Sequence, residues 1–106
     1  MFVPKVKNQQ TDLLMQAVLE LKTEEEAYRF FEDIFTIKEL QAVAQRLAVA
    51  RLLRQKVTYQ DIADQTGAST ATISRVNRSL TYGAGGYQLV LGRLPEAESA
   101  DRESDK

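Results

Sequence analysis

Apolar residues recur every three or four positions through most of the chain, which is the spacing of one face of a helix. Between Asn8 and Leu21 this face carries Leu14, Val18 and Leu21, with further apolar residues beside it. Convincing alternation of apolar and polar residues, the mark of a strand, occurs nowhere, and no hairpin turn is recognisable. The pattern therefore predicts an all-α fold.

Three more helix starts are marked by a capping-box pattern, in which a threonine is followed three residues later by an acid. The threonines are Thr23, Thr36 and Thr58. Each hydroxyl can accept a hydrogen bond from a free amide of the first turn while the acid reaches back, although Asp61 is a poorer third member than a glutamate. Helices are therefore expected to start near 24, 37 and 59.

Two of these helices carry apolar faces that predict a core. The helix from 24 to about Asp33 is expected to bury Phe30, Phe31 and Ile34. The longest helix, roughly 37–54, has a core-facing stripe at steps of three or four, formed by Leu40, Val43, Leu47, Ala50 and Leu53.

Residues 59–78 read YQDIADQTGASTATISRVNR, which has the spacing of a helix-turn-helix. Ala63 is small where two helices cross closely, and Gly67, four residues later, ends the first helix in a left-handed conformation. Ile62, Ile73 and Val76 are placed to hold the two helices at a fixed angle.

The second helix of this motif, about 70–80, is expected to begin with a cap from Ser69 or Thr70. Ile73, Val76 and Leu80 share its inner face, so its outer face is free to enter a DNA major groove. No acid lies between Gln65 and Leu94 to repel phosphates. The candidate DNA-contacting residues are Ser69, Thr70, Ala71, Thr72, Ser74, Arg75 and Arg78.

Charge is distributed unevenly around this motif. The net charge of −1 divides into −3 for residues 1–34, +5 for residues 35–94 and −3 for residues 95–106. A basic middle favours a polyanionic partner. We therefore expect one helical domain over 1–94, followed by an acidic, disordered tail over 95–106 with nothing large and apolar to bury.

Composition narrows the possible chemistry. The chain has neither cysteine nor histidine, which removes thiolate chemistry, the commonest general base and the commonest metal ligands. We expect no cofactor and no metal. A carboxylate-based enzyme remains a minor alternative, with its acids on the second helix: Glu24, Glu25, Glu26, Glu32 and Asp33. Neither a membrane span nor a secretory signal is recognisable, so the expected location is the cytoplasm and no membrane partner is expected.

Residues 23–82 resemble the Trp repressor superfamily, in particular its TrpR-like YerC/YecD branch. The resemblance is carried by Phe35-Thr36, by Gln45-Arg46-Leu47, by the helix-turn-helix and, most specifically, by residues 71–83, which read ATISRVNRSLTYG. It implies a six-helix subunit whose N-terminal helices interlock with those of a second copy to form an intertwined homodimer. The implied partner is double-stranded DNA with a palindromic operator, and the implied function is transcriptional regulation, with repression as the expected outcome.

The resemblance also implies a site for a small-molecule effector. Trp repressor holds the indole of its corepressor between two arginines, which match Arg46 and Arg75, and its other ligand contacts match Thr36 and Ser79. These arginines are equally suited to binding phosphate or pairing with acids. Val76 stands where Trp repressor has glycine, beside the indole site, so L-tryptophan is not the expected effector. A helix-turn-helix that docks onto a protein of a transcription assembly is the alternative function.

Overall fold

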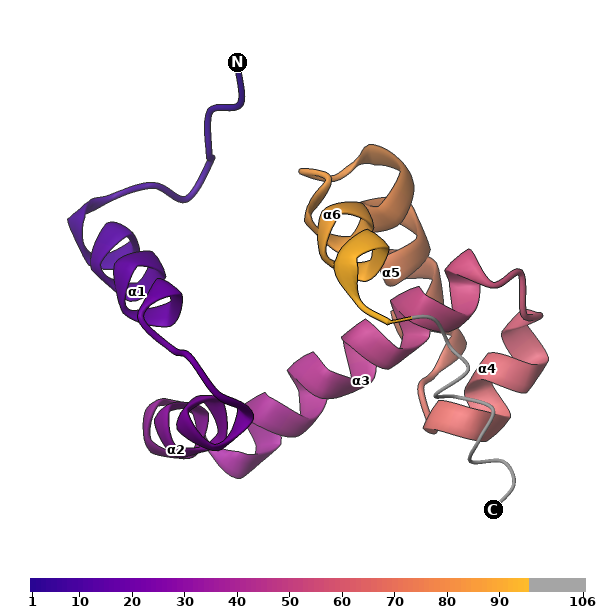
Figure 1. Ribbon diagram of the computed structural model, residues 1–106. Helices are drawn as coiled ribbons and strands as arrows, with labels where there is room; N and C mark the ends of the chain where they lie inside the picture. Colours follow the sequence, from indigo (N-terminus) through magenta and orange to yellow (C-terminus); the bar gives the residue numbers. More distant parts are fainter. Residues whose placement is uncertain (96–106) are drawn as a thin grey trace. The chain divides into compact units, whose positions relative to one another are not determined.

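The computed structural model describes residues 1–95, which form six helices and no strand (Figure 1). The helices are α1 (Gln9–Leu19), α2 (Glu24–Ile34), α3 (Ile37–Arg54), α4 (Tyr59–Thr66), α5 (Thr70–Tyr82) and α6 (Gly86–Arg93). The predicted all-α fold is confirmed. Apart from Pro95, the predicted acidic tail lies outside the described residues. Within residues 1–95, no helix has both the length and the apolar character needed to cross a membrane.

The three predicted helix starts are confirmed, and a threonine hydroxyl caps each of them. Thr36 forms the complete capping box: its hydroxyl accepts from the Glu39 N–H at 3.0 Å, and its own N–H donates to the Glu39 carboxylate at 2.9 Å. At α2 the acid reaches one residue further back, because the Glu26 carboxylate accepts from the N–H of Lys22. At α4 the Thr58 hydroxyl accepts from the Asp61 N–H.

The chain divides into two compact units, Met1–Ala44 and the part from Gln45 onward. The N-terminal unit contains α1, α2 and the beginning of α3, and none of its residues is fully buried. Phe31 packs edge-on against Phe35, with ring centroids 5.5 Å apart, and against Phe30 at 5.9 Å. The burial expected of α2 is incomplete in the single chain, where Phe30 and Phe31 are partly covered and Ile34 is 48% exposed.

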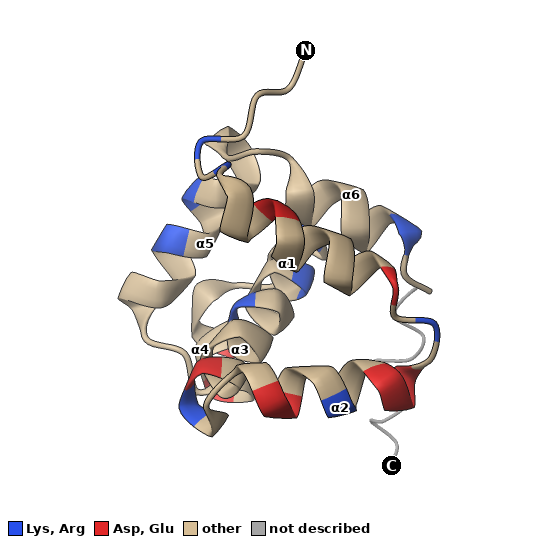
Figure 2. Ribbon diagram, turned by 90° about the vertical axis from the view of Figure 1, so that its left-hand side faces the viewer, with Lys and Arg blue, Asp and Glu red and all other residues tan. Residues whose placement is uncertain are grey.

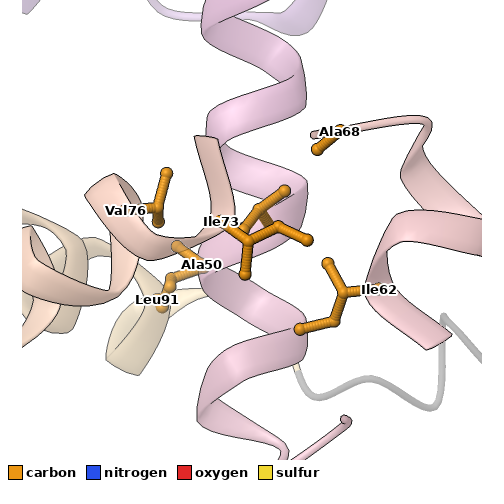
Figure 3. Close-up of a cluster of buried hydrophobic side chains, with 7 residues drawn as sticks. Ala50, Ile62, Ala68, Ile73, Val76 and Leu91 are labelled. Atoms are coloured by element: carbon orange, nitrogen blue, oxygen red, sulfur yellow. The ribbon is translucent and has the colours of Figure 1, made fainter. Parts of the chain in front are cut away.

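The C-terminal unit has a continuous apolar core built from α3, α4, α5 and α6 (Figure 3). Its buried members are Val49, Ala50, Ile62, Ala68, Ile73, Val76 and Leu91. The predicted stripe on α3 is right only in part: Ala50 is buried and Leu53 packs against the core, whereas Leu47, like Val43 in the N-terminal unit, stays exposed. Burial is therefore concentrated where the helix-turn-helix packs against the second half of α3.

The corner between α4 and α5 has the backbone that its sequence predicts. Gly67 lies in the left-handed region, with φ 75°, and its N–H donates to the carbonyl of Ala63 at 2.9 Å. Ala63 packs against the edge of the core, so the last turn of α4 closes tightly over a small side chain. An added Cβ at position 67 would meet no atom closer than 4.0 Å. Glycine is therefore needed there because of its backbone angle and not because a side chain would clash.

We predict that Gly67→Ala lowers the free energy of unfolding by about 1–2 kcal/mol, because an L-residue is strained in the left-handed region. The matched control is Gly92→Ala in α6, where an added Cβ meets nothing within 4 Å. That variant should be neutral or stabilised by about 0.5 kcal/mol through helix propensity. Urea unfolding followed by circular dichroism at one protein concentration measures both. Equal effects of the two substitutions would contradict the assignment of strain to position 67.

Candidate nucleic-acid interface

Helix α5 has one face fixed in the core, which determines the face it presents outward. Ile73 and Val76 are fully buried and Leu80 packs beside them, as the spacing predicts. Ile73 lies among residues from α3, α4 and the α4–α5 turn (Figure 3). With these side chains inserted, α5 cannot roll about its axis without opening the core.

The seven candidate contact residues all belong to the start and the outer face of α5. Six of them are exposed and Thr72 is half-buried. Of the two possible caps, the structure uses Ser69: its hydroxyl oxygen accepts from the N–H of Thr72 at 3.1 Å. Thr70 is the first residue of the helix and stays exposed. The beginning of α5 thus presents a group of small hydroxyl side chains to solvent.

The electrostatic character of α5 is wholly positive. Arg75 and Arg78 are exposed, and within residues 1–95 neither forms an ion pair with an acid. Figure 2 shows basic residues and no acidic residue on α5, in contrast to the acids along α2. Pairing with acids of the described chain is therefore not what Arg75 does, and both guanidinium groups are available to a polyanion.

A contact from outside the motif also stabilises the turn. The side-chain amide of Gln45 on α3 donates to the carbonyl of Thr66 at 3.2 Å. The Thr66 hydroxyl donates to the Ile62 carbonyl at 2.7 Å and accepts from the Ala68 N–H at 3.1 Å. Gln45 is 21 residues from Thr66, so no local pattern in the sequence signals this bond. It ties the last turn of α4 to α3.

The far end of α5 is closed by a second glycine with a packing role. A Cβ added to Gly83 would lie 2.5 Å from the carbonyl oxygen of Ser79, a contact that requires the backbone to shift. The Gly83 N–H donates to that same carbonyl at 2.9 Å. The chain therefore turns out of α5 by passing close over its last carbonyls, and α6 follows from Gly86.

The residues matched to an effector site have different environments. Arg46, Arg75 and Ser79 are exposed in the C-terminal unit, whereas Val76 is 1% exposed and forms part of the core. Thr36 belongs to the N-terminal unit, where its hydroxyl caps α3. No group of three or more potential metal ligands among Asp, Glu, His and Cys occurs within residues 1–95.

An all-helical subunit that exposes the second helix of a helix-turn-helix has the fold of a DNA-binding regulator. The chain belongs to the Trp repressor family, whose model, described as Trp repressor protein, matches residues 9–95. Among curated proteins it is 50% identical over 99 residues to the uncharacterized protein YerC of Bacillus subtilis strain 168, covering 93% of this chain and 95% of that protein.

Two crystal structures have closely similar folds. A TrpR-like protein from Eubacterium eligens ATCC 27750 matches with a TM-score of 0.80 and 56% identity, over 87% of this chain and 98% of the other. A Trp repressor candidate from Staphylococcus aureus matches with a TM-score of 0.81 and 45% identity, over 88% of this chain and 93% of the other. The six-helix architecture is thus shared across nearly the whole described chain.

Proposed function

We propose that this protein is a homodimeric, sequence-specific DNA-binding regulator that represses transcription by placing α5 in the major groove of its operator. The observation that carries the proposal is the outer face of α5: exposed, free of acids, bearing Arg75 and Arg78, and held by a buried inner face. Membership of the Trp repressor family supports it.

The outer face of α5 offers the groups that major-groove recognition uses. An arginine can bind the O6 and N7 atoms of a guanine with two hydrogen bonds, or neutralise a phosphate. The hydroxyl of Ser74 can donate or accept at either base of a pair, and the methyl of Ala71 can contact the methyl of a thymine. We infer that residues 69–75 lie nearest the base edges, because the first turns of a recognition helix enter the groove.

The N-terminal unit supports the homodimer. Most of its large apolar side chains are exposed in the single chain, among them Leu13, Leu19, Tyr28, Ile34 and Ile37. An apolar cavity of about 340 Å³ opens between α2 and α3, lined in part by Phe31 and Leu40. Exposed apolar surface on this scale marks an interface. A second copy, whose own α1 and α2 have the same unmet need for burial, is the occupant we propose.

We predict that the protein at micromolar concentration has twice its chain mass of 12.0 kDa. Light scattering coupled to gel filtration measures this. Tyr28→Asp, which places a charge at the α2–α3 cavity, should shift the protein toward monomer because a buried unpaired carboxylate is strongly unfavourable. Arg78→Ala, on α5, should leave the mass unchanged. A monomeric parent would contradict the proposed dimer.

We predict that Arg75→Ala and Arg78→Ala each weaken operator binding. Selection of fragments from a random DNA pool first supplies the operator, and fluorescence anisotropy then measures affinity at several salt concentrations. An arginine that reads a base should contribute about 1–3 kcal/mol, and its loss should relax specificity at one position. An arginine that contacts phosphate should weaken all sequences alike and lower the salt slope by about one unit.

The matched control is Arg29→Ala, which removes an exposed arginine of α2 that is paired with Glu25. It should bind DNA like the parent. If Arg75→Ala and Arg78→Ala both bind DNA as tightly as the parent protein, the recognition face is misassigned. A stable dimer that selects no DNA sequence would instead favour the alternative function, in which the helix-turn-helix docks onto a protein of a transcription assembly.

We infer that DNA binding by this protein does not use L-tryptophan as a corepressor. Within the Trp repressor family the indole lies beside a glycine of the recognition helix, and Val76 takes that position here. Val76 is fully buried in the C-terminal core, packed with residues such as Ile73 and Leu91 (Figure 3). Its side chain therefore already fills core space on the inner face of α5, so α5 needs no ligand to hold it in place.

We predict that isothermal titration calorimetry with L-tryptophan detects no binding in the micromolar range and that operator affinity is the same with and without it. Overpacking a site already occupied by a valine typically costs about 1–3 kcal/mol, which weakens a ligand about ten- to a hundredfold. Micromolar binding, or a tenfold rise in operator affinity with tryptophan, would show that the pocket is open.

A further inference from the structure

The outer face of α5 extends one turn beyond the two arginines, to Tyr82. At 3.6 residues per turn, Tyr82 projects within about 20° of Arg75 and about 40° of Arg78, and on the opposite side of the helix from Ile73. Its side chain is 82% exposed, the highest value for a large apolar or aromatic residue between 45 and 95. Spacing and exposure thus place Tyr82 on the same stripe as the arginines.

The surroundings of Tyr82 leave this end of α5 open to a polyanion. The four residues that follow it, 83–86, have no side chain larger than the methyl of Ala84. The acid-free stretch between Gln65 and Leu94 includes all of them. No bulky or negatively charged neighbour in this segment therefore keeps a phosphodiester backbone away from the phenolic hydroxyl.

We propose that Tyr82 donates a hydrogen bond from its phenolic hydroxyl to a phosphate at the outer edge of the major groove; this inference rests on the proposed function. Thr70 and Tyr82 are separated by about 18 Å along the helix axis, whereas the major groove is about 12 Å wide. With the first turn of α5 at the base edges, Tyr82 is too far along the helix to read a base. It lies instead at the level of the sugar–phosphate backbone, where tyrosine is a common donor.

A protein contact at Tyr82 is less consistent with its neighbours. A second copy approaching this stripe symmetrically would bring its own Arg75 and Arg78 toward the same two arginines. Like charges brought together in this way oppose association. DNA neutralises both arginines and accepts from the hydroxyl at once, so charge complementarity favours the nucleic acid.

The test compares Tyr82→Phe and Tyr82→Ala with the parent, on the selected operator and on random DNA, over a range of salt concentrations. Tyr82→Phe removes only the hydroxyl. We expect it to weaken binding to the operator and to random DNA about three- to tenfold. Its salt slope should equal that of the parent, because a neutral donor displaces no counterion. The control Arg29→Ala, at an exposed residue of α2 that is paired with Glu25, should bind both DNAs like the parent.

The outcomes separate this inference from the function on which it rests. A parent protein that binds no DNA overturns the proposed function itself. If the arginine variants lose affinity while Tyr82→Phe does not, only the role of Tyr82 is overturned. A loss with alanine but not with phenylalanine assigns the effect to the ring and contradicts hydrogen bonding. Tyr82→Ala could instead lower the average mass in solution, by dissociating the dimer, while each remaining dimer binds DNA as before. That result assigns the residue to a protein contact and overturns the inference.

Discussion

The close packing of Ile62, Ile73 and Val76 between α3, α4 and α5 determines the direction in which the candidate reading face points. A helix of 13 residues with few polar anchors would otherwise be free to roll or slide on its neighbours. Three branched side chains with almost no exposure remove that freedom, because a close-packed core has no alternative positions of similar energy for them. The packing of this core therefore fixes the direction in which each candidate DNA-contacting side chain of α5 points.

Hydrogen bonds stabilise the turn between α4 and α5. Thr66 uses its hydroxyl both as donor and as acceptor within the turn, and Gln45 satisfies its carbonyl from α3. These groups are partly buried. Leaving one of them without a partner would therefore cost more free energy than a typical hydrogen bond contributes to stability. The ion pairs of Lys7 with Asp12 and of Arg29 with Glu25 lie in the N-terminal unit and are largely exposed, where such pairs contribute little.

The two units divide the physical tasks of the protein. The C-terminal unit contains all seven buried apolar residues of the described chain, together with the positively charged α5. The N-terminal unit contains most of the exposed apolar surface and the acidic first turn of α2. One unit thus has a core of its own, whereas the other leaves much apolar surface exposed in the single chain. This separation is what a regulator needs if its dimerisation and its DNA contacts are to be built from different helices.

Sequence alone determined the features that depend on neighbours three or four positions apart. The threonine caps before α2, α3 and α4, the left-handed Gly67 and the inner face of α5 are local patterns, and each was predicted at the right place. Helix α6, in contrast, was expected only through the family resemblance, because its eight residues have no side-chain cap.

Tertiary structure decided the contacts between distant residues. It placed the side-chain amide of Gln45 on the carbonyl of Thr66, which is 21 residues away. It also left Phe30 and Phe31 of α2 only partly covered and Ile34 48% exposed in the single chain. Helical periodicity shows that one side of a helix is apolar. Whether that side meets the same subunit or another molecule depends on the path of the whole chain, and no local pattern records it.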